Sequence, residues 1–410
     1  MSDDRPRLRN IEAFPVDHEG QKFLGLRDPA GYTSSVLLLP IPAVEIVRQF
    51  DGEHSIIDIQ AALMERHDEL VLRQDIEEMI AALDQHGFLD SPAFAARRVE
   101  IERTFLEAPL RPATHAGGAY ANDATELRQA MDRFFEPPAG PGVIASTECA
   151  PRGGPCVEAI IAPHIDFHRG GPAYAWAYRD LAERCDADVF VIFGTCHAGM
   201  RDPFALTRKD YDTPFGPARV DRELVDTIAS RARQDCFASE LAHRSEHSIE
   251  FQAVFLNYLY ASKRDIAVVP ILASFAHEAM IRRQRVEDDP RVARFLDAVG
   301  ESVAASGRRV AFVAGADLAH VGPRFGDAEP LADEDLKRVA DEDRRMLAAV
   351  EQGDARAFFE SVTADGDRRR ICGLSPIYAL LRLVGKSGVV RHYGQWPDPN
   401  AVVTYASVTF

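Results

Sequence analysis

The second half of the chain alternates between short apolar runs and segments of helical periodicity. The apolar runs occupy residues 157–163, 188–194, 266–274 and 309–316, and another apolar stretch closes the chain at 402–410. Helical patterns lie near 172–184, 221–233, 246–261, 290–305 and 333–350. Apolar runs without polar alternation are typical of strands that are buried on both faces. This order predicts an α/β domain over residues 156–410, in which helices flank a layered central sheet.

Residues 1–95 carry a different, mainly helical pattern. Ser55 is placed to cap one of these helices, and Gly87 to end another. The pattern consists of an apolar run at 34–40 followed by helical segments at 43–50, 55–67 and 73–86. It predicts a small winged-helix-like α+β domain. Residues 96–155 include the stretches EPPAGPGV and PRGGPC, which predict a linker with an embedded helix near 123–135.

Length and composition are those of a folded protein rather than a disordered chain. The 410 residues exceed what one compact core usually holds, and 46% of them are hydrophobic. The net charge of −17 argues against a nucleic-acid surface, because phosphates attract clustered Lys and Arg. No apolar run approaches the roughly 20 residues that span a bilayer, and the polar N-terminus does not resemble a signal peptide. We therefore expect a cytoplasmic protein that binds neither nucleic acid nor membrane, with its six scattered cysteines as free thiols.

Histidine and aspartate follow three of the predicted buried strands. His164 and Asp166 come after the first run, His197 after the second, and Asp317 and His320 after the fourth. In α/β sheets, ligands bind beyond the carboxyl ends of the strands. One polar pocket at this edge therefore explains the pattern better than three unrelated surface loops.

A further histidine stands at the start of a predicted helix, in the segment HRSEHSIEFQAVFLNYL. His247 and Glu250 are three positions apart and Glu246 and Glu250 four apart, so they can be neighbours on that helix. These residues could belong to the pocket. They could equally form a solvated helix start, where carboxylates suit the positive end of the helix dipole.

Cys372 precedes another helical segment, in RRRICGLSPIYALL. A helix N-terminus and the nearby Arg368, Arg369 and Arg370 predict a lowered thiol pKa and a reactive thiolate. The alternative is a buried structural cysteine. Imidazole and thiolate ligands together suit Fe, Cu or Zn rather than Mg or Ca.

Five motifs resemble those of the Memo-like family, also called AmmeMemoRadiSam system protein B. They are APHIDFHRGGPAYAWAY, FGTCH, SEHSIEFQAVFLNYL, ADLAHVG and ICGLSPIYALL, and the resemblance covers residues 157–410. That family is similar to the class III extradiol dioxygenases. The resemblance implies a metal site of His164, His197 and Cys372, with Fe²⁺ as the first expectation and Cu or Zn as alternatives. It also implies His320 with Asp317 as an acid/base pair, and His247 as a further pocket residue.

The motifs depart from the family pattern at several positions. Asp166 and Phe167 stand where the family often has Gly-Tyr, and Cys196 stands where Ser or Asn is common. The iron dioxygenases also use a carboxylate as third ligand, where this chain offers a thiol. Dioxygenase activity therefore does not follow from the implied fold.

The N-terminal segments FDGEHSIIDIQAALMER and DIEEMIAALDQHGFLD resemble a PqqD-like winged helix, a module that binds leader peptides. The alternative is a packing domain without a peptide ligand. Three hypotheses follow for the whole chain. It is a metal-dependent redox enzyme, or a non-catalytic partner of a radical SAM protein or leader peptide, or a zinc hydrolase in which His247 and Glu250 supply the general base.

Overall fold

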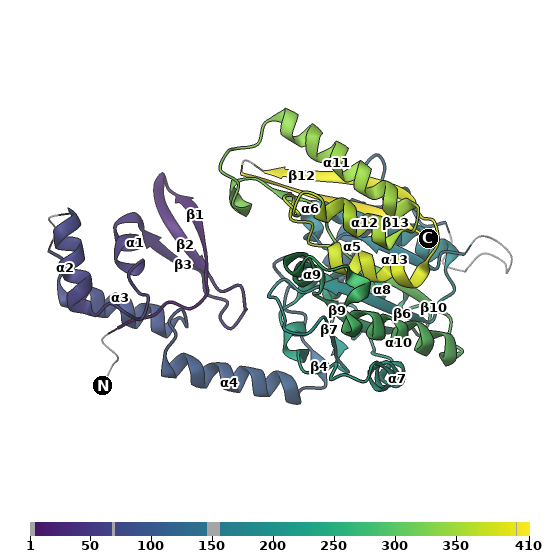
Figure 1. Ribbon diagram of the computed structural model, residues 1–410, viewed down its shortest axis with the longest axis horizontal. Helices are drawn as coiled ribbons and strands as arrows, with labels where there is room; N and C mark the ends of the chain where they lie inside the picture. Colours follow the sequence, from purple (N-terminus) through teal and green to yellow (C-terminus); the bar gives the residue numbers. More distant parts are fainter. Residues whose placement is uncertain (1–4, 68–69, 146–155, 399) are drawn as a thin grey trace. The chain divides into compact units, whose positions relative to one another are not determined.

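A computed structural model describes residues 5–67, 70–145, 156–398 and 400–410, and the chain forms two compact units. Unit 1 is Met1–Glu107 and unit 2 is Ala108–Phe410 (Figure 1). The segment PRGGPC and Cys149, assigned to the linker from the sequence, lie largely or wholly outside the described residues. Within the described ranges, no helix is both long enough and apolar enough to cross a membrane.

Unit 1 combines a small antiparallel sheet with four helices. The strands, in the order β1-β2-β3, are β1 (Glu12–His18), β2 (Gln21–Arg27) and β3 (Leu37–Pro40). The helices are α1 (Ile41–Val47), α2 (Ile56–His67), α3 (Arg73–Gln85) and α4 (Pro92–Glu107). Its core includes Ile59, Ile76 and Leu83, which are fully buried. The strand β3 and the three helices after it were predicted, whereas the β1–β2 hairpin was missed because its residues are at most half buried along much of its length.

Unit 2 is built around a mixed sheet with the strand order β11-β13-β5-β10-β6-β9-β7, and β12 pairs with β13. Its four adjacent parallel strands are β5 (Ala159–Ala162), β10 (Val310–Gly315), β6 (Val189–Thr195) and β9 (Ala267–Ala273). The outer strands are β7 (Phe204–Leu206), β11 (His320–Val321), β12 (Val389–Asp398) and β13 (Ala401–Thr409). The four predicted apolar runs are therefore the four parallel strands, and their carboxyl ends share one edge of the sheet.

Helices flank this sheet, as predicted (Figure 1). They include α6 (Phe167–Arg184), α7 (Arg222–Ala232), α8 (His247–Tyr260), α10 (Pro290–Ser306), α11 (Asp333–Glu351) and α13 (Leu374–Val384). The helix predicted within the linker is α5 (Ala124–Phe134), which packs against α6 in unit 2. The short helices α9 (Ala276–Arg282) and α12 (Ala355–Thr363) were not predicted. A two-residue ladder joins β4 (Leu110–Arg111) to β8 (Asp210–Tyr211).

Two glycines of the APHIDFHRGG segment lie within a helix rather than in a turn. Gly170 and Gly171 precede the helical pattern predicted near 172–184, which favours a turn at these positions, but α6 already begins at Phe167. A Cβ atom at Gly170 would lie 2.3 Å from the Ile165 side chain, and one at Gly171 would lie 2.4 Å from the Phe134 ring. These positions therefore require glycine for close packing of the helix rather than for a turn.

Candidate metal centre

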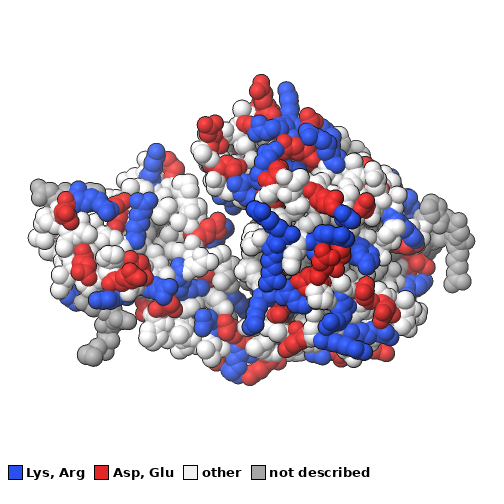
Figure 2. All heavy atoms as spheres, in the orientation of Figure 1, with Lys and Arg blue, Asp and Glu red and all other residues white. Residues whose placement is uncertain are grey.

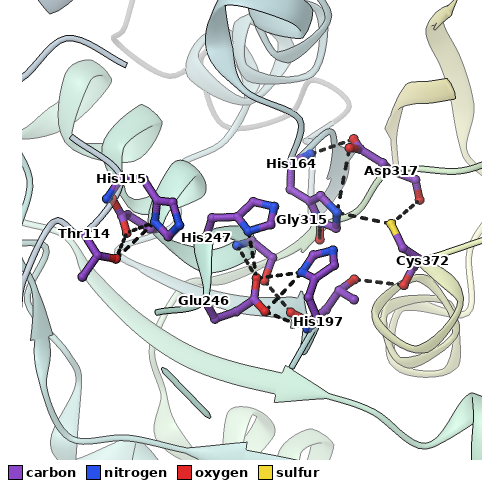
Figure 3. Close-up of polar contacts among 12 residues, drawn as sticks. Thr114, His115, His164, His197, Glu246, His247, Gly315, Asp317 and Cys372 are labelled. Carbon is purple, nitrogen blue, oxygen red and sulfur yellow. Dashed lines mark hydrogen bonds and ion pairs between the residues drawn. The ribbon is translucent and has the colours of Figure 1, made fainter. Parts of the chain in front are cut away.

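Three histidines converge at the carboxyl edge of the sheet. His164 follows β5, His197 follows β6, and His247 is the first residue of α8. The rings of His164 and His197 are 4.9 Å apart between centroids, and the His247 ring lies 5.2 Å from the first and 4.6 Å from the second. One ring nitrogen from each lies within 4.8 Å of the others, a grouping that could hold a metal ion (Figure 3). The expectation that segments distant in sequence meet in one pocket is met for these residues.

Polar contacts at Nδ1 orient all three rings. The Nδ1 atom of His164 lies 2.9 Å from the Gly315 carbonyl oxygen. The Nδ1 atoms of His197 and His247 lie 3.0 Å and 3.3 Å from the same Glu246 carboxylate oxygen. Because each Nδ1 faces an acceptor, it carries the proton and leaves the Nε2 lone pair for a metal.

Glu246 is the carboxylate that holds two of the rings, and its role was missed from the sequence. It caps α8 by accepting a hydrogen bond from the Ser248 backbone N–H, and it also accepts one from the His197 N–H at 2.8 Å. Although burial opposes the charge, His197 and His247 hold the pKa of Glu246 well below its ordinary value. The sequence left open whether Glu246 belongs to the pocket or to a solvated helix start; in the structure it caps the helix and also contacts two histidines of the site.

Burial keeps two of the histidines neutral. It lowers the pKa of His164 to about 3, with the neighbouring His197 acting in the same direction. Burial likewise lowers the pKa of His247 well below its ordinary value. At His197 burial is outweighed by Glu246, which raises the pKa. Neutral imidazole is the form that binds metal, so His164 and His247 need no deprotonation first.

Cys372 lies beside this group, in the loop before α13. Its Sγ is 3.2 Å from His164 Nε2, and its carbonyl oxygen accepts a hydrogen bond from Thr195 Oγ1 at 3.0 Å. The prediction of a lowered thiol pKa is wrong: burial, reinforced by Asp317, raises the pKa of Cys372 well above its ordinary value. The three arginines that were expected to lower it bind other carboxylates, namely Glu342, Asp343 and Asp327.

Asp317 and His320 follow β10 but make separate contacts. Asp317 accepts a hydrogen bond from the His164 backbone N–H at 2.9 Å, and burial raises its pKa to about 6. His320 Nδ1 lies 3.1 Å from the Leu318 carbonyl oxygen. In the described part of the chain no hydrogen bond joins the two side chains. Asp317 therefore positions His164, where the sequence had suggested that it orients His320.

Glu250 belongs to a buried cluster next to the three histidines. Its carboxylate pairs with Arg111, accepts from Tyr120, and binds His115 through the backbone N–H at 3.0 Å and through Nδ1 at 2.8 Å. Burial opposes this charge, but Arg111 lowers the pKa of Glu250 to about 2. The carboxylate is thus fully engaged and inaccessible, so the hydrolytic hypothesis is wrong in making Glu250 a general base.

The partners of Glu250 come from a segment that was predicted to be a linker. Arg111, His115 and Tyr120 lie in unit 2, between 130 and 139 positions from Glu250 along the chain. The His115 ring lies 5.5 Å from the His247 ring. Figure 3 shows it on the side of His247 that faces away from His164 and His197. No local pattern marked these residues as part of the site.

Two polar residues of the APHIDFHRGG segment lie outside the histidine group. Asp166 stands at the N-cap position of α6, and its Oδ2 atom lies 3.6 Å from Arg169 Nε. His168 is exposed on α6, as expected for a polar surface residue. The motif thus contributes one histidine, His164, to the candidate centre.

Known proteins resemble this chain over the part that contains the histidine group. The sequence profile of a family described as "Memo-like protein" matches residues 111–409. A "MEMO1 family protein" of Methanococcoides burtonii is 33% identical over 311 residues, which cover 73% of this chain and 99% of that protein. Another of Aquifex aeolicus is 26% identical over 99% of this chain and 100% of its own length. A third, of Thermus thermophilus, is 27% identical over 82% of this chain and 92% of its own length. The profile match begins at Arg111, so it includes the segment that binds Glu250.

Proposed function

Because this chain belongs to the Memo-like family, we propose that unit 2 is a metal-dependent redox protein with one ion at the histidine group. The observation that carries the proposal is the convergence of His164, His197 and His247 within 4.8 Å. Each ring has its Nδ1 atom held by an acceptor, which leaves three Nε2 atoms for one ion.

The ligands we propose are His164, His197 and Cys372, with His247 as a further nitrogen donor. The Sγ of Cys372 at 3.2 Å from His164 Nε2 is close enough for both atoms to bind one ion after small shifts. Mixed imidazole and thiolate donors suit Fe²⁺, which we place first, and also Cu and Zn. A bound ferrous or cuprous ion would supply one-electron redox chemistry.

The surrounding residues have separate roles in this proposal. Glu246 fixes two imidazoles, and Asp317 fixes the His164 backbone. His320, whose Nδ1 lies 3.1 Å from the Leu318 carbonyl oxygen, is the residue that we propose moves a proton, the role that the family resemblance implied. The His197 side chain is 38% exposed, which gives a substrate access to the centre. A dioxygenase reaction is not part of the proposal, because its usual two-histidine, one-carboxylate ligand set is absent from the proposed ligands.

Metal content tests the proposal directly. Protein purified without oxygen should contain about one ion per chain, and a His164→Ala, Cys372→Ala double variant should contain almost none. Cys236→Ala is the matched control, because Cys236 is a buried free cysteine with no contact to the histidine group among the described residues. Equal metal content in the wild type and the double variant would show that the metal does not bind at the proposed site.

A second candidate function concerns unit 1, which lies outside the matched range 111–409. We propose that it binds a leader peptide or a radical SAM protein. Strand β3 is an edge of the three-stranded sheet and carries an exposed Leu38, with Val36 exposed just before it. An exposed edge strand can pair with an extended peptide. A fluorescently labelled leader peptide encoded beside this gene should bind the full chain. Leu38→Glu should lower the affinity about tenfold. Ile57→Glu, which changes an exposed residue on α2, is the control and should leave the affinity unchanged.

A further inference from the structure

A cavity of about 170 Å³ lies beside Cys372, between α9 and residues 367–375, and it is open to solvent. Thr195 and Cys196, the two residues before the proposed ligand His197, also line it. The rest of its wall is mainly apolar and includes Ala273, Ala276, Met280, Ile371 and Leu374. Because a cavity of about 150 Å³ in another protein holds benzene, this one has room for a molecule of roughly six to eight heavy atoms.

Asp367 gives this cavity a carboxylate that pairs with no cation. Its Oδ1 atom accepts a hydrogen bond from the Ile371 backbone N–H at 2.8 Å, and its Oδ2 atom has no hydrogen-bond or ion-pair partner in the described ranges. No Lys or Arg among the described residues lines the cavity. The neighbouring Arg368, Arg369 and Arg370 pair with other carboxylates. One oxygen of Asp367 is therefore free to bind a positively charged ligand.

The electrostatic potential at the Cys372 end of the cavity is negative too. Burial raises the pKa of Cys372, and the carboxylates of Asp317, Glu246 and Asp367 raise it further. Burial also raises the pKa of Asp367, but a cation bound there would favour the charged carboxylate. Acidic and basic side chains are intermixed on the face of unit 2 that Figure 2 shows. Selection of a ligand by its charge therefore depends on the wall of the cavity rather than on a large charged surface.

We propose that this cavity binds a small organic amine in its ammonium form, with Asp367 as the ion-pair partner and the apolar wall around the carbon skeleton. Ser274 also lines the cavity, and its hydroxyl forms no hydrogen bond with any described residue, so it is a second acceptor for the ammonium group. A few polar groups in a mainly apolar pocket are typical of small-molecule sites. As the substrate class of the centre at Cys372, the amine rests on the proposed function.

Equilibrium dialysis with radiolabelled benzylamine tests the cavity in the full-length protein. The protein is treated with a chelator, so that the amine cannot bind a metal ion instead. Benzyl alcohol is the competitor, because it has the same shape and no charge. The measurement is made at pH 8, where benzylamine is still protonated and positive charge on the exposed His277, which also lines the cavity, is minimised.

We expect about one saturable site per chain, with benzyl alcohol competing at least about tenfold more weakly than unlabelled benzylamine. Asp367→Asn should weaken binding about tenfold, because it removes the charge but keeps the oxygen that accepts from the Ile371 N–H. Asparagine also tolerates the positive φ of 55° at this position. Asp365→Asn is the matched control and should leave the affinity unchanged, because Asp365 is exposed, pairs with Arg368 and does not line the cavity.

The position of the bound amine is tested at the thiol. Benzylamine should slow the reaction of Cys372 with methyl methanethiosulfonate, in which the thiolate forms a methyl disulfide and releases methanesulfinate. The same reaction at the exposed Cys156 should be unchanged. Equal affinity for amine and alcohol, or an unchanged affinity in Asp367→Asn, would overturn the proposal. Metal content is measured on untreated protein: a bound ion without amine binding contradicts the cavity alone, and amine binding without an ion contradicts the centre alone.

Discussion

Replacing Glu246 by Gln tests whether one buried carboxylate orients the histidine group. The native side chain accepts hydrogen bonds from the backbone of His197 and Ser248, and it faces Nδ1 of both His197 and His247. Glutamine keeps the size and one oxygen acceptor. It removes the negative charge and turns an NH₂ group toward at least one N–H donor.

The magnitude follows from the number of contacts that are lost. One oxygen can still serve the backbone N–H of Ser248 or of His197, so the helix cap survives in part. The imidazoles lose their charged acceptor and become weaker, less well oriented ligands. Loss of such a partner typically lowers metal affinity by about 10- to 100-fold, or roughly 1.4 to 2.7 kcal/mol.

The assay is competition for Zn²⁺ against a chromogenic chelator at fixed pH. Glu250→Gln is the matched control, because Glu250 is equally buried one turn further along α8 but binds Arg111, His115 and Tyr120. It should reduce stability while leaving the affinity of the folded protein within about threefold of wild type, less than 1 kcal/mol. An unchanged affinity in Glu246→Gln would refute the view that this carboxylate prepares the site.

Three further predictions concern stability, each measured by urea unfolding. His243 is fully buried, and burial lowers its pKa to about 3. Between pH 6 and pH 4 the histidine therefore takes up a proton only in the unfolded chain, so the free energy of unfolding falls as the pH falls. His243→Gln should reduce the slope of this fall by about 1.4 kcal/mol per pH unit. An unchanged slope would contradict this. Gly171→Ala should cost about 1–3 kcal/mol, because its Cβ would overlap the Phe134 ring, and wild-type stability would show that the helix can shift instead. Arg111→Met should cost about 3–5 kcal/mol by leaving Glu250 buried without its cation, and a neutral result would mean that the pair is dispensable.

The central sheet could be predicted because its parallel strands are buried on both faces. Runs such as 188–194 are apolar at nearly every position, and β6 is buried along its whole length. The β1–β2 hairpin gave a weaker signal, since several of its residues remain exposed. Local apolar content therefore predicts the strands that lie in the core, but it does not reveal strands near the surface.

The candidate site was predictable only where chain order fixes position. His164 follows β5 and His197 follows β6, two parallel strands on either side of β10. The carboxyl ends of these strands lie at the same edge of the sheet, so the topology brings the two histidines together. The contact of Glu250 with His115 spans 135 positions and has no local pattern that could indicate it. The thiol pKa at Cys372 was predicted in the wrong direction, because burial outweighs a helix N-terminus when the nearby arginines bind elsewhere.

X-ray absorption at the zinc edge of the Zn²⁺-loaded full chain tests the metal centre most directly. We predict at least two imidazole nitrogens at about 2.0–2.1 Å and one sulfur at about 2.3 Å from the metal. In Cys372→Ser the sulfur contribution should disappear while the imidazoles remain. A nearest-neighbour shell of oxygen atoms without imidazole would contradict the centre, and imidazole without sulfur in the wild type would remove Cys372 from it.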